Sequence, residues 1–276
     1  MLKITHDSGF FSCNSLKLHH IVKYINKYKK LPDTLDCQEQ FSLYKPHDKT
    51  KEDITSTYFD NSSITFQYSG FIDFHWLYQF IQYNALDFNS LIPLIRKYFS
   101  PSNTINDIIN HLETKYSLVY TNLCVLYYRG NDKIYESKLS SYQDVVDRAH
   151  LIMKKNPNII FLIQSDETEF IETLTSIFPN SFYFKDEIRH VKKCKQSVDL
   201  LYRNIQNANF EYSKKYLAIT IILSRCKYIV CGSGNCSLWI MLYRGHANNI
   251  SQYLEGIWYD ASYTHNPINN DNCFIV

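Results

Sequence analysis

Small polar and charged residues follow three apolar, strand-like runs in this 276-residue sequence. Arg129-Gly130-Asn131-Asp132-Lys133 follows LCVLYY, Ser165-Asp166-Glu167 follows IIFLIQ, and Gly232-Ser233-Gly234-Asn235 follows YIVC. A guanidinium at a strand end can bind two phosphate oxygens at once. Backbone N–H groups at a helix start, with the helix dipole behind them, can hold a phosphate. The pattern therefore predicts a site for a phosphorylated ligand.

The first of these loops also has structural explanations. Arg129 fits a phosphate-binding residue and an exposed or ion-paired loop arginine about equally well. Asp132 and Lys133 either interact with each other or with solvent, or belong to the ligand-binding site. In the site, Asp132 orients Arg129 and Lys133 adds positive charge near a leaving diphosphate.

The other two loops leave similar choices. Ser233, Gly234 and Asn235 form either a phosphate-binding turn or an ordinary tight turn. Ser165 and Asp166 either bind ribose, sugar or acceptor hydroxyls, or cap a helix. Capping is the favoured interpretation for the acidic residue that follows them.

A further cluster lies near the N-terminus, where His6, Asp7 and Gly9 follow the short strand-like run Leu2–Thr5. Asp7 or His6 can deprotonate an acceptor hydroxyl. Asp and Gly are common in turns in any case, so turn formation remains the alternative.

Alternating strands and helices must position these residues. In the C-terminal half we expect strands at 123–128, 158–164, 182–184 and 228–231, and helices at 142–155, 167–177, 212–226 and 237–243. Continuous apolar strands of this kind predict a parallel sheet covered on both faces. Ligands bind beyond the carboxyl ends of such strands, so all three loops are expected to open onto one crevice.

The N-terminal half begins with a strand, helix, strand pattern over residues 2–37, which is a βαβ opening. Helices are expected at 87–99 and 103–116. We predict an α/β fold with an N-terminal domain over 1–118, a C-terminal domain over 119–260, and a tail over 261–276.

Composition excludes several classes of function. The net charge is +2 and no basic run suggests a nucleic-acid groove. The eight cysteines form no CxxC pair, which argues against a zinc site and for a reducing, cytoplasmic setting. The first residues do not read as a signal peptide. No apolar run reaches the roughly 18 residues of a membrane span.

These motifs resemble those of the fucosyltransferase superfamily, which includes α-1,6-fucosyltransferases, nodulation fucosyltransferases and protein O-fucosyltransferases. The resemblance is best over residues 87–254. VLYYRGNDK (125–133) is similar to the family's strand ending in His-x-Arg-Arg-x-Asp-Lys, and 161–167 to its strand ending in Thr/Ser-Asp-Asp/Glu. LSRCKYIVCGSGN (223–235) resembles its last helix, strand and phosphate turn. Gly9-Phe10-Phe11-Ser12 fits its N-terminal glycine loop less specifically.

The resemblance implies two facing Rossmann-like domains of GT-B type, each a parallel sheet with helices on both faces. It implies inverting transfer with no metal or other cofactor. Arg129 falls on the family's essential arginine, which holds the diphosphate, and Asp7 falls near a proposed base. The donor side then also comprises Tyr127, Asp132, Lys133, Ser165, Asp166, Ser233, Gly234 and Asn235. His6, Gly9 and Phe10 lie on the acceptor side.

Three departures stand out: Tyr127 replaces the family's histidine, Gly130 its second arginine, and Ile219 the aspartate that reads guanine in α-1,6-fucosyltransferases. We expect transfer of a sugar from a nucleotide-sugar, with GDP-fucose as first guess, to a glycan or other hydroxyl acceptor. A nucleotide- or glycan-binding protein with a degenerate site is the alternative. A different doubly wound nucleotide-dependent enzyme is a third possibility.

Overall fold

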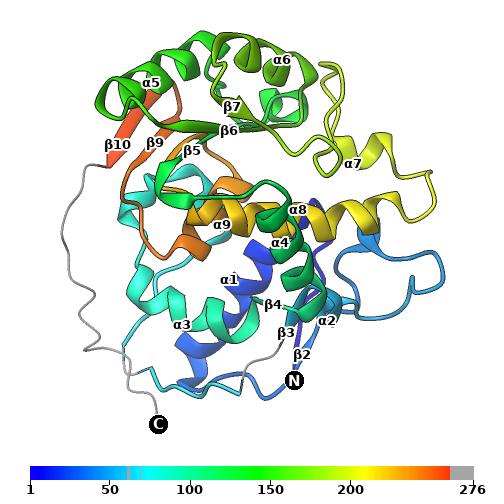
Figure 1. The fold of residues 1–276 in the computed structure, drawn as a ribbon. Helices are drawn as coiled ribbons and strands as arrows, with labels where there is room; N and C mark the ends of the chain where they lie inside the picture. The colour runs from blue at the N-terminus through cyan, green and yellow to red at the C-terminus, as the bar shows by residue number, and fades with distance from the viewer. Residues whose placement is uncertain (61–62, 69, 262–276) are drawn as a thin grey trace.

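A six-stranded sheet with the order β10-β9-β8-β5-β6-β7 forms the centre of the C-terminal half (Figure 1). The structure is a computed structural model that describes residues 1–60, 63–68 and 70–261. Its strands are β5 (Leu123–Tyr128), β6 (Ile160–Ser165), β7 (Ser181–Phe182), β8 (Tyr228–Gly232), β9 (Ile250–Leu254) and β10 (Ile257–Ala261). Only β10 is antiparallel to its neighbour. The predicted parallel sheet of this half is confirmed, and the β9–β10 hairpin was not predicted.

Helices cover both faces of this sheet, as predicted (Figure 1). They are α5 (Tyr142–Lys155), α6 (Thr168–Ile177), α7 (Val198–Leu201), α8 (Ala208–Arg225) and α9 (Asn235–Arg244). From β5 the chain moves outward through β6 to β7, and then returns to add β8 and β9 on the other side. Right-handed crossovers in opposite directions place α5 and α6 on one face and α8 and α9 on the other.

The strand order reverses between β5 and β8, and this reversal locates the site. In doubly wound sheets, ligands bind beyond the carboxyl ends of the strands at such a switch point. Arg129 directly follows β5, and Ser233 directly follows β8. All six residues of β5 are buried, because helices and neighbouring strands enclose it on every side. The loops after β5 and β8 therefore begin at well-packed positions in the core.

The N-terminal half differs from the prediction. Its helices are α1 (Phe10–Tyr28), α2 (Thr55–Tyr58), α3 (Phe88–Tyr98) and α4 (Asn103–Lys115). Its described strands are two short pairs: β1 (Leu2–Lys3) beside β2 (Leu35–Asp36), and β3 (Phe59–Asp60) beside β4 (Ser100–Pro101). The β1-α1-β2 opening is present and parallel, as predicted. A second Rossmann-like sheet is not found in the residues that the structure describes.

The segment between α1 and α3 explains this difference. It contains few continuous apolar runs, and its aromatic side chains are buried one at a time in turns and short 3-10 helices. Tyr44, Tyr58 and Tyr83 are each at most 1% exposed. Such a segment contributes to a core without forming the extended strands that a parallel sheet requires.

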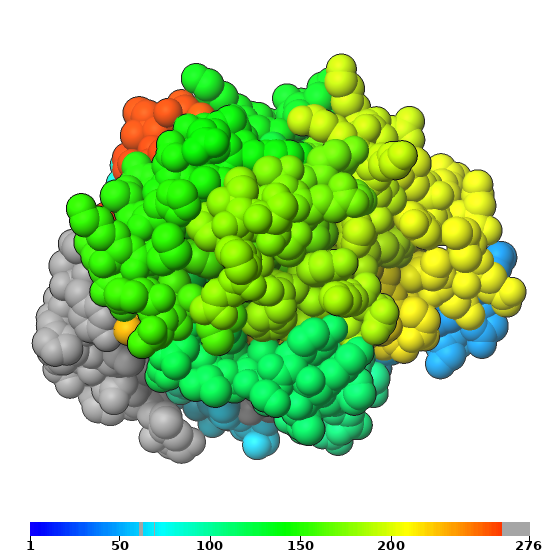
Figure 2. Space-filling view, turned by 45° about the horizontal axis from the view of Figure 1, so that its top comes forward, coloured from blue at the N-terminus to red at the C-terminus, as the bar shows by residue number. Residues whose placement is uncertain are grey.

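One core joins the two halves across the predicted boundary at residue 118. α1 packs against α9, where the Ser15 hydroxyl donates to Asn235 Oδ1 at 2.7 Å and accepts from Trp239 Nε1 at 3.0 Å. The ring of Phe99 lies 4.7 Å from that of Trp239. In the space-filling view, the green and yellow C-terminal segments form most of one face, with blue N-terminal residues at its edge (Figure 2).

Of the predicted tail, residues 262–276 lie outside the described residues. Among the helices that are described, none combines the length and the apolar content that crossing a bilayer takes.

Lys17 is a charged residue inside this shared core, with 1% of its surface exposed. Its Nζ lies 5.0 Å and 5.4 Å from the ring centroids of Phe99 and Phe59. Burial lowers the pKa of Lys17, and the charges of Cys37 and Asp53 oppose that shift. Aromatic faces attract a cation, but they replace only part of its lost hydration.

We therefore expect Lys17→Met to stabilise the protein by on the order of 1 kcal/mol near pH 7. Because the folded-state pKa is lowered, the unfolded chain binds more protons, and wild-type stability rises with pH up to the unfolded value. The gain from methionine should therefore shrink as the pH approaches 10. Denaturant unfolding of both proteins between pH 7 and 10 measures this. A gain that does not depend on pH would contradict the explanation.

Candidate functional site

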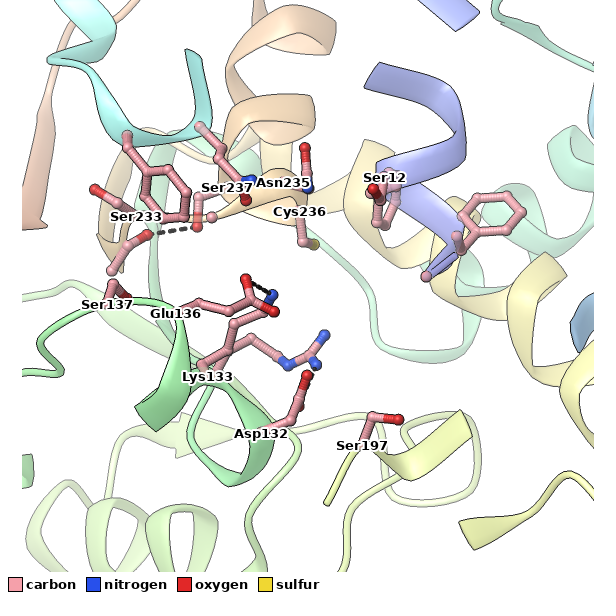
Figure 3. A pocket seen from close by; sticks show the side chains of 18 of the residues that line it. Ser12, Asp132, Lys133, Glu136, Ser137, Ser197, Ser233, Asn235, Cys236 and Ser237 are labelled. Carbon is pink, nitrogen blue, oxygen red and sulfur yellow. Dashed lines mark hydrogen bonds and ion pairs between the residues drawn. The ribbon is translucent and has the colours of Figure 1, made fainter. Parts of the chain in front are cut away.

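A cavity of about 660 Å³ opens at the switch point, between the two halves (Figure 3). Its N-terminal wall comes from the segments 6–12 and 76–80. Its C-terminal wall comes from the segments 127–140, 197–200 and 232–237. The cavity thus collects the ends of β5 and β8, the start of α1 and the loop before α8.

Arg129 is fixed in this wall by three contacts, with 22% of its side chain exposed. Nε donates to Asp166 Oδ2 at 3.0 Å, Nη1 to the Tyr216 hydroxyl at 3.0 Å, and Nη2 to Asp132 Oδ1 at 3.1 Å. Burial acts to lower the pKa of Arg129, but Asp166 and other neighbours outweigh it and hold the pKa above its ordinary value. Nη1 and Nη2 each keep a further N–H that can bind an anion.

Asp166 supports Arg129 from behind and does not line the cavity. It is 4% exposed, and its Oδ1 accepts the Gly130 N–H at 2.9 Å. The Ser165 hydroxyl accepts the Glu167 N–H at 3.0 Å. The sequence placed Ser165 and Asp166 at the donor, but β6 lies on the far side of β5 from the switch point. Their loop is therefore displaced behind Arg129, and this corrects the expectation of direct contact.

Glu167 explains the glycine beside Arg129. It is fully buried, and its carboxylate accepts the Asn131 N–H at 2.9 Å and the Tyr142 hydroxyl. A Cβ at position 130 would lie 2.0 Å from Glu167 Oε1. A side chain at position 130 would therefore require this carboxylate to move out of its hydrogen bonds. Glu167 is the N-cap residue of α6, but its side chain makes no cap hydrogen bond.

The start of α9 forms the wall opposite Arg129. Ser233, Gly234 and Asn235 all line the cavity, as the sequence predicts. Their polar groups are partly committed: Ser233 Oγ donates to Tyr253 O at 2.9 Å, and Asn235 Oδ1 accepts from Ser15. No side chain caps the helix start. The first-turn N–H groups and the helix dipole therefore provide a positive end facing the guanidinium.

Tyr127 and Tyr216 occupy the floor between these two walls. Tyr127 is 3% exposed, and its hydroxyl lies 3.3 Å from that of Tyr216. Burial raises the pKa of both phenols, so they stay neutral. Ile219 is buried one turn further along α8 and does not line the cavity. The sequence missed Tyr216 because its helix reads as a uniformly apolar core helix.

Lys133 and Glu136 stand on the wall that faces Asn235 and Cys236 (Figure 3). Lys133 Nζ donates to Glu136 Oε2 at 2.5 Å, and the Glu136 side chain is 40% exposed. Glu136 escaped sequence reasoning, although its spacing of three residues from Lys133 is typical of an ion pair on one helical turn. Within the described ranges, no three His, Cys, Asp or Glu side chains group as metal ligands do.

The N-terminal wall contains three of the four residues expected there. His6, Gly9 and Phe10 line the cavity. His6 Nε2 lies 3.0 Å from Ser12 Oγ, and burial lowers the pKa of His6. Asp7 is exposed and outside the lining, and its carboxylate accepts the Ser42 N–H at 3.0 Å. The structure thus separates Asp7 from the cavity and leaves His6 there.

Comparisons with known proteins identify the fold. No protein-family model matches the chain, and no curated protein matches its sequence. A structure of NodZ alpha-1,6-fucosyltransferase soaked with GDP-fucose aligns with a TM-score of 0.54 and 11% identity, covering 94% of this chain and 99% of that one. The chain therefore has a fucosyltransferase-like GT-B fold, which confirms the predicted resemblance at the level of fold. The predicted arrangement of two facing Rossmann-like domains is not confirmed, because the described residues form only one large sheet.

Two further structures align less well. NodZ co-crystallized with GDP has a TM-score of 0.39 and 13% identity, covering 60% of this chain and 50% of that one. An Arabidopsis thaliana FUT1 mutant in complex with GDP has a TM-score of 0.35 and 14% identity, covering 60% of this chain and 35% of that one.

The contact between Gly130 and Glu167 can be tested by Gly130→Ala. The new methyl group must displace a buried carboxylate and leave the Asn131 N–H and the Tyr142 hydroxyl without their acceptor. We expect a loss of about 1–3 kcal/mol in the free energy of unfolding. Gly70→Ala is the control, because a Cβ there meets nothing within 4 Å. Equal stability of both variants in denaturant would contradict the assigned role of Glu167.

Proposed function

We propose that this chain is a glycosyltransferase that moves a sugar from a nucleotide-sugar to a hydroxyl acceptor. The observation that carries the proposal is the pairing of Arg129 with the uncapped start of α9 across one cavity. Both present N–H donors and positive charge to the same space, which suits a diphosphate. GDP-fucose is the first donor to test, since the NodZ structure that shares this fold was soaked with it.

In the proposed reaction, the bond between the sugar and the diphosphate breaks while the acceptor oxygen attacks from the opposite side. Negative charge grows on the leaving diphosphate. Arg129, Lys133 and the start of α9 stabilise that charge, and no metal ion is needed for this. Preorganisation matters here, because the three contacts of Arg129 hold it in place before the charge develops.

The acceptor enters along the N-terminal wall. Trp76, Leu77 and Phe80 give this wall apolar surface, on which the C–H face of a sugar ring can pack. His6 is placed to take the proton of the attacking hydroxyl, with Ser12 orienting its ring. The proton then resides on His6, the new bond joins the sugar to the acceptor, and the electron pair of the broken bond leaves on the diphosphate.

A second candidate function is a nucleotide- or glycan-binding protein with a degenerate transferase site. Gly130 favours it, because Glu167 occupies the space beside Arg129 where the resembling family has a second arginine. Tyr127 also favours it, since a buried, neutral phenol replaces a titratable histidine. Turnover separates the two functions.

A panel of nucleotide-sugars in the presence of EDTA tests the proposal. We expect wild-type protein to hydrolyse or transfer at least one donor, and Arg129→Ala to lose at least about 100-fold in turnover. Arg129→Lys should recover little, because lysine cannot keep all three contacts. Arg96→Ala is the control, since Arg96 is exposed on α3. Turnover retained in Arg129→Ala would overturn the mechanism, and a thermal shift without turnover would support the binding protein.

The pH profile tests His6. Burial lowers its pKa below the ordinary value of about 6.5, so His6 is neutral at pH 7. Transfer should decline only as the pH falls through this lowered pKa, because the protonated ring cannot accept a proton. His6→Gln should reduce transfer about 100-fold and remove this acidic limb. Asp7→Asn should keep the transfer activity and the acidic limb, with the limb moved to lower pH because the Asp7 charge raises the pKa of His6. A larger loss in Glu136→Gln would assign the proton to that carboxylate instead.

A further inference from the structure

Asp199 places a third carboxylate at the cavity, beside those of Asp132 and Glu136, on the short helix α7. It belongs to the loop that joins β7 to α8, and nothing in its sequence surroundings marks it as a site residue. Asp199 interacts electrostatically with the charged side chains of Arg129, Arg189 and Asp132. Asp199 therefore lies beside the guanidinium that the proposed function assigns to the diphosphate.

The loop that carries Asp199 is anchored firmly. Arg189 donates to Val198 O at 3.3 Å and to Asn209 Oδ1 at 2.7 Å, and its guanidinium carbon lies 4.0 Å from the ring centroid of Tyr202. Asn209 Nδ2 donates to the Asp199 carbonyl at 2.8 Å. The backbone of Asp199 is thus held by contacts that do not involve its carboxylate. Supporting contacts of this kind are what a ligand-binding side chain requires.

The carboxylate itself is incompletely satisfied. Its Oδ1 is shielded from solvent and makes no hydrogen bond in the part of the chain that the structure describes, while the Tyr44 hydroxyl interacts with the carboxylate and acts to lower its pKa. Burial raises the pKa of Asp199, against the opposing effects of Arg129, Tyr44 and Arg189. A buried acceptor without a donor destabilises a fold, so its presence at a cavity wall calls for an explanation. Asp199 also lines the cavity, so its carboxylate can accept a hydrogen bond from a ligand bound there.

We propose that Asp199 binds a hydroxyl group of the nucleotide-sugar, next to the diphosphate held by Arg129. The inference rests on the proposed function. A carboxylate accepts hydrogen bonds from sugar hydroxyls. In a nucleotide-sugar, hydroxyls lie on both sides of the diphosphate, on the ribose and on the transferred sugar. Asp199 thereby determines donor specificity, while Arg129 supplies affinity for the charge that all such donors share.

Calorimetric binding of GDP-fucose, GDP and inorganic diphosphate to wild type and Asp199→Asn tests this inference. We expect Asp199→Asn to weaken GDP-fucose about tenfold or more, and to bind inorganic diphosphate as tightly as wild type or more tightly, because a negative charge beside Arg129 is removed. Weakening of GDP as well assigns the contact to the ribose, and weakening of GDP-fucose alone assigns it to the transferred sugar. Asp107→Asn, an exposed carboxylate on α4, is the matched control.

Thermal unfolding without ligand provides a second readout. Because Asp199 is an unsatisfied buried acceptor, Asp199→Asn should be at least as stable as wild type, which separates lost binding from lost folding. Unchanged GDP-fucose affinity in Asp199→Asn, with wild type binding normally, would overturn the inference and leave the proposed function standing. Weaker binding of inorganic diphosphate would also overturn it, because diphosphate has no sugar hydroxyl. If the wild-type protein binds no nucleotide from a wider donor panel, both the role of Asp199 and the proposed function are contradicted.

Discussion

The site depends on how Arg129 is held. A guanidinium left free at a strand end samples many rotamers, and binding would have to order it each time. Here Asp166, Asp132 and Tyr216 each fix one nitrogen, from three different segments of the chain. Two of these partners are carboxylates, which keep the charge on the arginine despite its burial. Arg129 lines the same cavity as the start of α9, so in the proposed function its charge is held in place before any ligand arrives.

The same arrangement explains the departures from the family pattern. Glu167 fills the space where a second arginine would stand, and its hydrogen bonds to Asn131 and Tyr142 make that carboxylate part of the fold. Tyr127 pairs with Tyr216, which itself holds Arg129, so the replacement of a histidine by tyrosine belongs to the support of the guanidinium.

Packing between the halves gives the cavity its second wall. Ser15 links α1 to Asn235 and Trp239 of α9, so the start of α1 is held beside the start of α9. Tyr83 adds to this link, because its hydroxyl accepts the Gly234 N–H at 3.1 Å. The described part of the N-terminal half has no large sheet. This half still provides an apolar wall and the His6 ring at the switch point.

The sequence by itself determined the parallel strands β5 to β8 and the positions of Arg129, Ser233, Gly234 and Asn235 at the ends of β5 and β8. These follow from local patterns, because continuous apolar runs and glycine turns report burial and chain reversal directly. Tertiary structure alone decided which side chains face the cavity. The strand order places Ser165 and Asp166 behind Arg129. Asp7 lies outside the cavity, where its carboxylate accepts the Ser42 N–H. Long-range packing places Tyr216, Glu136 and Asp199 in the cavity wall. Such choices depend on contacts between residues far apart in the chain, which no local pattern encodes.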